Sequence, residues 1–178
     1  AVGGCSRVTL DGKIDARVAM TDEALGLALL TPQSSLAPME VAELAGRAPR
    51  LQSEVAVAGY SYEGVLGAPS MTFGKLVDLR GLQGEEAVDR FDLASLPGDA
   101  GGPVMDATGA VIGMLLPRAG EDRQLPKEVS FSADAGALQD AMRKAGISAR
   151  IARDTGAMAP EDLTRKGRGL AVLVSCWE

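Results

Sequence analysis

The sequence predicts a mainly β protein of short strands, followed by a C-terminal segment that mixes helix and strand. Of the 178 residues, 46% are hydrophobic, which is enough to bury a core, but only 3% are aromatic. The 22 glycines and 9 prolines mark frequent turns. Between Arg7 and about Phe131, short apolar stretches alternate with turn residues, a spacing typical of antiparallel strands in a barrel or sandwich.

The predicted strands of this first part follow one another closely. They lie in the stretches RVTL, DARVAM, LGLALLTP, SEVAVAGY, SMTFGKLVDL and GAVIGMLLP. Asp11 and Gly12 join the first two, and an Asp-Gly pair favours the positive φ angles that a tight hairpin needs. The stretch MDATGAV predicts a similar but looser turn later in the chain.

After Phe131 the pattern changes, and the chain divides into a β region, residues 1–131, and a C-terminal region, residues 132–178. Apolar residues at helical spacing predict an amphipathic helix that starts at Ser132 or Asp134 and ends near Gly146. The stretch APEDLTRKGRG predicts a second short helix, with acids early and bases late. The continuous apolar run from Leu170 to Trp177 predicts a final strand that is buried on both sides.

Composition excludes several functions. A net charge of −6 argues against binding to nucleic acid, and we interpret the one basic cluster, Arg165 to Arg168, as the cationic end of the second helix. No metal site is expected, because the chain has no histidine and its cysteines have no neighbouring ligands. The four acids of residues 84–92 lack the ligand pattern of a calcium loop, so we interpret this stretch as a solvated strand edge. No cofactor motif is present.

One motif suggests a family. The stretch PGDAGGPVMDATGAVIGM resembles the nucleophile motif of trypsin-like serine peptidases, including the bacterial HtrA-type enzymes, in which a serine occupies the position of Ala100. The preceding stretch VAVAGYSYEGVLGAPSMTFGKLVDLRG is similar to the segment leading to that motif, and the match covers roughly Ser6 to Leu116. The resemblance implies two six-stranded barrels. This chain would supply about three strands of the first and all of the second.

The resemblance also indicates which catalytic groups are lost. Peptidases of this type use a serine, a histidine and an aspartate together. Gly26, in TDEALGLALLTP, stands where the aspartate is expected, and Ala100 replaces the serine. No histidine exists in the chain. The backbone of Gly98, Asp99 and Ala100 would still form an oxyanion-hole-like turn, and Leu116, Pro117 and Arg118 correspond to the family's position for binding the substrate backbone.

Cys5 and Cys176 lie near the two ends of the chain. They are either buried free thiols or a disulfide, and the resemblance favours the disulfide. An extracytoplasmic location, periplasmic or secreted, then follows as an expectation. Because the first barrel lacks strands, we also expect an upstream segment of the same protein, or a cleaved chain that stays associated, to supply them.

Three functions remain open. The first is a pseudopeptidase that binds a polypeptide or acts as a scaffold. The second is an active serine endopeptidase whose nucleophile is replaced in this chain and whose histidine lies on an N-terminal segment. It requires that Gly26 is tolerated or that another residue, such as Asp22, serves as orienter. The third is a cell-envelope interaction module in which residues 152–178 bind an envelope protein and the barrel is a support.

Overall fold

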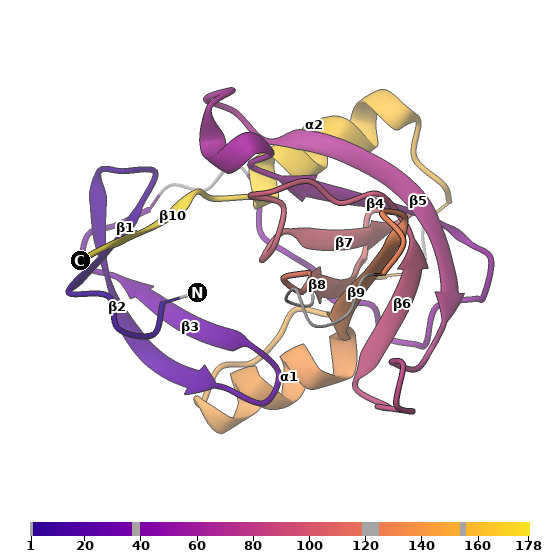
Figure 1. The fold of residues 1–178 in the computed structure, drawn as a ribbon, viewed down its shortest axis with the longest axis horizontal. Helices are drawn as coiled ribbons and strands as arrows, with labels where there is room; N and C mark the ends of the chain where they lie inside the picture. Colours follow the sequence, from indigo (N-terminus) through magenta and orange to yellow (C-terminus); the bar gives the residue numbers. More distant parts are fainter. Residues whose placement is uncertain (1, 37–39, 119–124, 154–155) are drawn as a thin grey trace.

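The chain folds into a closed six-stranded barrel and a separate four-stranded sheet, with one helix against each of two sides of the barrel (Figure 1). The computed structural model describes residues 2–36, 40–118, 125–153 and 156–178. The mainly β architecture with a C-terminal helix confirms the predicted fold class.

The four-stranded sheet contains the first three strands and the last one. Its members, in spatial order, are β10 (Val174–Trp177), β1 (Arg7–Leu10), β2 (Ile14–Asp22) and β3 (Leu27–Pro32). Asp11 and Gly12, with φ angles of 50° and 66°, form the predicted turn between β1 and β2. The buried side chains of Val8, Leu10 and Ala16 form a small core beneath this sheet.

The barrel is built from the middle of the chain. Its strands, in spatial order, are β4 (Glu54–Gly59), β5 (Ser70–Asp78), β6 (Val88–Asp92), β9 (Val129–Asp134), β8 (Val111–Leu115) and β7 (Pro103–Asp106), and a short 3-10 helix, η1 (Tyr62–Gly64), lies between β4 and β5. Alternate residues point inward, so Leu76, Phe91 and Ile112 join one apolar core. Burying each such side chain contributes about 1.5–3 kcal/mol.

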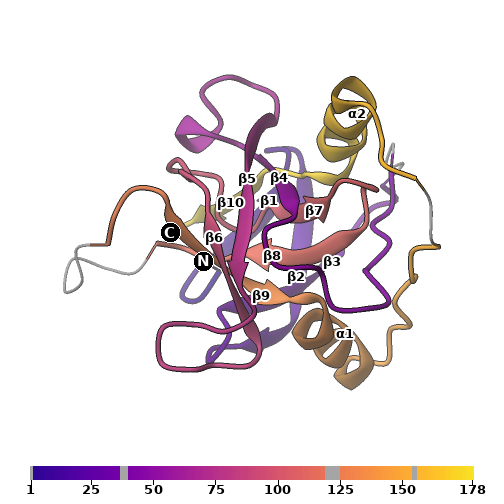
Figure 2. The ribbon, with the colours of Figure 1, turned by 90° about the vertical axis from the view of Figure 1, so that its right-hand side faces the viewer.

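Two helices cover opposite sides of the barrel (Figures 1 and 2). Helix α1 (Ala135–Lys144) begins after Asp134, whose Oδ1 accepts a hydrogen bond from the backbone N–H of Ala137 at 2.6 Å. Asp134 is therefore the cap, while Ser132 belongs to β9. Helix α2 (Pro160–Leu170) inserts Leu163 into a second apolar cluster on the outer face of the barrel.

The final strand differs from the prediction. β10 is an edge strand, paired only with β1 among the described residues, and Val174 and Trp177 are 43% and 49% exposed. The prediction that this run is buried on both sides is therefore wrong, because an apolar run on a sheet edge lacks a covering layer. The run is also shorter than expected, since Leu170 ends α2.

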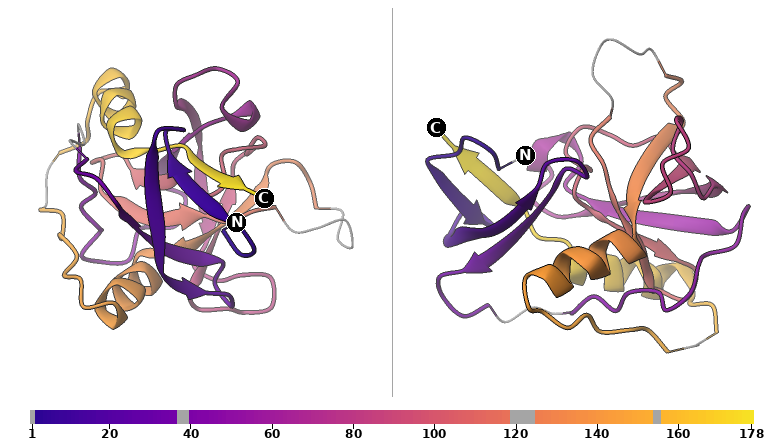
Figure 3. Two further views of the ribbon diagram at one scale, coloured as in Figure 1. Left: turned by 90° about the vertical axis from the view of Figure 1, so that its left-hand side faces the viewer. Right: turned by 90° about the horizontal axis from the view of Figure 1, so that it is seen from below.

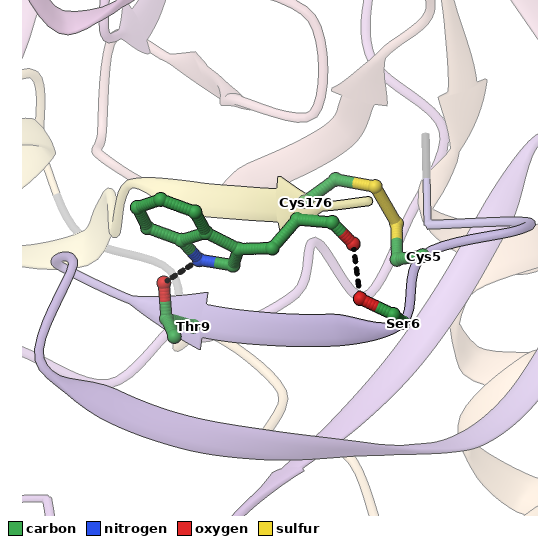
Figure 4. Close-up of a disulfide and its surroundings, with 5 residues drawn as sticks. Cys5, Ser6, Thr9 and Cys176 are labelled. Atoms are coloured by element: carbon green, nitrogen blue, oxygen red, sulfur yellow. Dashed lines mark hydrogen bonds between the residues drawn. A yellow bond between two sulfur atoms is a disulfide. The ribbon is translucent and has the colours of Figure 1, made fainter.

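A disulfide joins β10 to the start of the chain. Cys5 and Cys176 are bonded, with their Cα atoms 5.3 Å apart, which confirms the disulfide (Figure 4). The backbone N–H of Ser6 donates to the carbonyl oxygen of Trp177 at 2.8 Å, and the indole N–H of Trp177 donates to Thr9 Oγ1 at 3.0 Å. Figure 3 shows the yellow last strand beside the indigo first strand. The C-terminal strand thus supplies the fourth strand of this sheet.

Candidate functional site

The glycine-rich motif forms a tight turn before β7. Gly98 has a φ angle of 90°, and a Cβ atom added there would lie 2.2 Å from the carbonyl oxygen of Tyr60. A Cβ on Gly102 would lie equally close, 2.2 Å, to the carbonyl oxygen of Ala58. Both positions therefore require glycine, one for its conformation and both for close backbone contact.

Asp99 holds this turn in place. Its carboxylate is 1% exposed, and Oδ1 accepts a hydrogen bond from the hydroxyl of Ser61 at 2.6 Å. Oδ2 accepts from the backbone N–H of Leu96 at 2.9 Å, while the N–H of Asp99 donates to the carbonyl oxygen of Leu96 at 3.1 Å. Asp99 is thus fully used by the turn, which places it among the structural residues of the motif.

The two flanking amides are free. Within the described part of the chain, the backbone N–H groups of Gly98 and Ala100 have no hydrogen-bond partner, and both residues are exposed. Unpaired N–H groups next to each other can bind a carbonyl oxygen or a negatively charged oxygen. The oxyanion-hole-like role of this turn stays a prediction, and these two amides are the donors that it would use.

The turn is hydrogen-bonded to the end of β8. The N–H of Gly101 donates to the carbonyl oxygen of Leu115 at 2.7 Å. The N–H of Leu115 donates to the carbonyl oxygen of Gly102 at 2.9 Å. Leu116 follows directly, and a Cβ atom added to Gly26 would lie 4.0 Å from Leu116 Cδ2. The fold therefore links the three positions predicted from sequence, Ala100, Gly26 and Leu116, through the end of β8.

The segment after β8 leaves the barrel at this point. The N–H of Leu116 donates to the carbonyl oxygen of Phe131 at 2.8 Å, whereas Pro117 and Arg118 are exposed. The guanidinium of Arg118 donates to the carbonyl oxygens of Lys127 and Pro126 at 2.7 and 3.1 Å. The side chain of Arg118 is therefore hydrogen-bonded to the segment before β9.

The chemistry of the turn is limited by its side chains. Position 100 carries a methyl group, which cannot attack a carbonyl carbon, and no imidazole exists in the chain to accept a proton. The carboxylate of Asp22 accepts a hydrogen bond from the backbone N–H of Leu25 at 3.2 Å, so it closes the turn between β2 and β3. As it stands, this arrangement can bind a carbonyl group.

Two residues were missed from sequence. Ser61 supports Asp99 across 38 residues of sequence, and no local pattern indicates that contact. Asp89 is 2% exposed, so the interpretation of residues 84–92 as a solvated strand edge is wrong at this position. Alternation with Phe91 on β6 could have revealed it, since both side chains point into the barrel.

Two structural absences concern the described residues only. No group of three or more His, Cys, Asp or Glu side chains is placed to hold a metal ion there. In the same part of the chain, none of the helices has the length and apolar character needed to cross a membrane.

The chain is similar to known peptidases. The family model described as a trypsin-like peptidase domain matches residues 6–114. A crystal structure of the serine endoprotease from Yersinia pestis has 19% sequence identity and a TM-score of 0.60, covering 74% of this chain and 44% of that one. The active form of the Rv3671c protease from M. tuberculosis has 21% identity and a TM-score of 0.59, covering 78% and 62%.

Two further relatives extend this comparison. A serine-to-alanine mutant of Rv3671c in its inactive form is 25% identical, with a TM-score of 0.57, and the match covers 75% of this chain and 65% of that one. The uncharacterized protein y4bJ of Sinorhizobium fredii is 25% identical over 186 residues, which covers 98% of this chain but 29% of that protein. The chain thus spans less than a third of this curated relative.

Proposed function

Because the chain belongs to the trypsin-like peptidase domain family, we propose that it is a member that binds an extended polypeptide without hydrolysing it. The observation that carries this proposal is the motif turn, in which the N–H groups of Gly98 and Ala100 have no partner among the described residues, while Ala100 stands where the family's motif has its serine. Loss of the serine alone typically lowers kcat by about a million-fold in such enzymes. The remaining donors then serve binding.

The geometry supports a peptide as the ligand. The amides of Gly98 and Ala100 have no partner among the described residues and can donate to a peptide carbonyl oxygen, and the exposed residues Pro117 and Arg118 follow the end of β8, to which the turn is hydrogen-bonded. An extended peptide placed along this segment gains backbone hydrogen bonds, as in other cases of strand addition. Its side-chain preference would depend on residues around the turn.

The disulfide supports an extracytoplasmic location, in the periplasm or outside the cell. Disulfides persist in oxidising compartments and are rare in reducing ones. The bond between Cys5 and Cys176 holds the C-terminal strand in its sheet. A folded sheet that depends on this bond is suited to an oxidising environment.

Peptide binding and hydrolysis are tested together with labelled α-casein, an unfolded polypeptide. We expect saturable binding by fluorescence anisotropy and no release of acid-soluble fragments. Ala100→Leu adds an exposed branched side chain at the turn, and we expect it to weaken binding about tenfold or more. Ala145→Leu, at an exposed position after α1, is the matched control and should bind normally. Hydrolysis by the unmodified protein, or absence of binding, would contradict the proposal.

The active-peptidase alternative has its own test. It requires a histidine from another segment, and either tolerance of Gly26 at the aspartate position or an orienting carboxylate such as that of Asp22. The variant Ala100→Ser in the longest natural form of the protein would then cleave casein and react with a fluorophosphonate probe. If this variant stays unreactive, the alternative fails. If it reacts, the chain is a silenced peptidase rather than a natural binding protein.

The third function, an envelope interaction module in residues 152–178, is tested with point variants. Deleting the segment is a poor test, because α2 packs Leu163 against the barrel and β10 carries the disulfide. Exposed positions such as Trp177 and Val174 can instead be changed to serine. An unchanged set of partners in a pull-down from envelope extract would argue against this function.

A further inference from the structure

A cavity of about 360 Å³ opens at one end of the barrel, outside the motif turn. Its lining comes from the loop before β4, the start of β6 and the start of α1. Its charged lining residues are Arg47, Glu86, Asp89 and Asp134. Three of these four are carboxylates, and none belongs to the motif turn or to the segment after β8. The size is that of a small-molecule or side-chain site.

Asp89 is the unusual member of this lining. Its residue is 2% exposed, and its Oδ2 atom has no hydrogen-bond partner among the described residues. Asp89 faces Ser132 in the register of β6 and β9, and the hydroxyl of Ser132 is also buried without a partner. A buried carboxylate oxygen without a donor is costly while the group is charged, so Oδ2 of Asp89, which lines the cavity, is placed to accept a hydrogen bond from a ligand there.

The charge around Asp89 is negative. Asp134 caps α1 through its Oδ1 atom. Glu86 is exposed, and its Oε1 atom lies 3.7 Å from Nη2 of Arg80, which is also exposed. A second cavity of about 310 Å³ shares Glu86 and Asp134 with the first, and its other charged lining residues are Asp22, Asp140 and Lys144. Arg47 is the basic residue in the first cavity and Lys144 the one in the second. Carboxylates thus outnumber bases along both cavities.

We propose that this cavity binds a primary alkylammonium group, which donates hydrogen bonds to Asp89. An ammonium is a compact charge with three donors, which suits a site lined mainly by carboxylates. A bare metal ion fits less well, because no described group of three ligand residues is placed to hold one. The ammonium can come from a free amine or from a lysine side chain of a protein.

The protonation of Asp89 supports this assignment. Burial, and secondly the charge of Asp134, raise the pKa of Asp89 to about 7. A proton and an ammonium then compete for the same carboxylate. Besides Asp134, the charged groups lining this cavity are Glu86 and Arg47. Binding should therefore strengthen as pH rises through 7, while the alkylamine itself stays charged.

Titration of the protein with cadaverine, followed by ¹H–¹⁵N correlation spectra at about pH 8, tests the proposal. We expect saturable shifts at residues 86–89 and 132–136, and binding about 30-fold weaker at pH 5.5 than at pH 8. Pentanol, which lacks the charge, should cause no saturable shifts. Absence of shifts at these residues, or equal binding at both pH values, would overturn the proposal.

The variant Asp89→Asn keeps the shape of the side chain and removes its charge. We expect it to lose cadaverine binding, whereas Glu54→Gln, an exposed position on β4 outside both cavities, should bind normally. Unchanged binding by Asp89→Asn would overturn the proposal. If this variant does not fold, the wild-type shift map decides alone.

The source of the ammonium is distinguished by two probes. Nα-acetyl-lysine amide presents the ammonium of a protein side chain, and its Nζ-acetylated form is the uncharged control. Tighter binding of cadaverine indicates a free amine, and tighter binding of the lysine amide indicates a protein ligand. If cadaverine binds more tightly, the cavity acts independently of polypeptide binding at the motif turn. If the lysine amide binds more tightly, we expect a lysine-containing segment of a protein to bind in the cavity. If neither probe binds, the proposal fails.

Discussion

Gly98 and Gly101 have similar backbone angles, with φ values of 90° and 87°, but different surroundings. A Cβ on Gly98 would lie 2.2 Å from the carbonyl oxygen of Tyr60, whereas one on Gly101 would meet no atom within 4 Å. Both substitutions to alanine impose the same kind of backbone strain, and only Gly98→Ala adds a collision. We expect Gly98→Ala to lower the free energy of unfolding by about 2 kcal/mol more than Gly101→Ala.

Urea unfolding of both variants measures this difference directly. Because the strain at positive φ is common to the two glycines, their comparison isolates the close approach of backbone to backbone. If the two variants lose the same free energy of unfolding, the turn relaxes around the new methyl group. The close contact between Tyr60 and Gly98 would then not contribute to stability.

Asp89 predicts a pH dependence of stability. Its pKa, raised to about 7 in the folded protein, is near 3.8 in its ordinary state. Between these values the folded protein keeps a proton that the unfolded chain has released, so stability falls as pH rises from about 4 to about 7 and then levels off. Asp89→Asn should remove this fall. At pH 8 the free energy of unfolding of Asp89→Asn should exceed that of the wild-type protein by at most about 4 kcal/mol.

Free energies of unfolding at pH 4.5, 6 and 8 provide the measurement. The exposed substitution Glu54→Gln is the control, and its curve should run parallel to that of the wild-type protein. Asp89 would have no part in the pH dependence if the Asp89→Asn curve were also parallel to wild type.

At the scale of elements, β10 has one strand partner among the described residues, half-exposed side chains and a disulfide to the start of the chain. The strand lies at an edge with Val174 and Trp177 half-exposed, and the bond between Cys5 and Cys176 joins residues 171 apart in sequence. Closing so long a loop stabilises a protein by about 5 kcal/mol in the chain-entropy model. The double variant Cys5→Ser, Cys176→Ser should therefore lose β10 before the barrel unfolds.

Amide hydrogen exchange can locate this loss. We expect faster exchange at the β1 and β10 amides in the double variant, and unchanged protection of the barrel strands β4 to β9. Thr9→Val, which removes the hydrogen bond from the Trp177 indole but keeps the disulfide, is the comparison and should have a smaller effect. Uniform loss of protection would show that the sheet and barrel unfold together.

At the scale of the whole molecule, one sheet is closed and the other is not. The barrel has no free edge, whereas β10 and β3 each pair on one side only among the described residues. Exposed strand edges bind further strands. We therefore expect another segment of the same protein, or a cleaved chain, to complete this sheet, and expect these 178 residues alone to self-associate as concentration rises.

Size-exclusion chromatography with light scattering, over a range of concentrations, checks this expectation. A form of the protein that includes such a segment should remain monomeric at concentrations where the 178-residue chain associates. A monodisperse and fully protected monomer of the short chain would show that the four-stranded sheet is sufficient.

Several local features could be predicted from sequence. Asp11 and Gly12 predict their turn because turn geometry depends on adjacent φ angles, and Pro160 predicts the start of α2 for the same local reason. The motif from Gly98 to Gly102 predicts its tight turn because only glycine permits such contacts. The assignment of Gly26 and Ala100 to the positions of the aspartate and the serine comes from the family resemblance, and it stays a prediction.

Burial and long-range contact were decided by the tertiary structure. The apolar run ending at Trp177 has the composition of a buried strand, yet β10 pairs at a sheet edge. Asp89 lies in an acidic stretch, yet β6 runs between β5 and β9 in a closed barrel and turns its side chain inward. Sequence determines what a segment can form by itself. Whether a face of that segment is buried depends on which strands, distant in sequence, pack beside it or over it, because burial requires a neighbouring element.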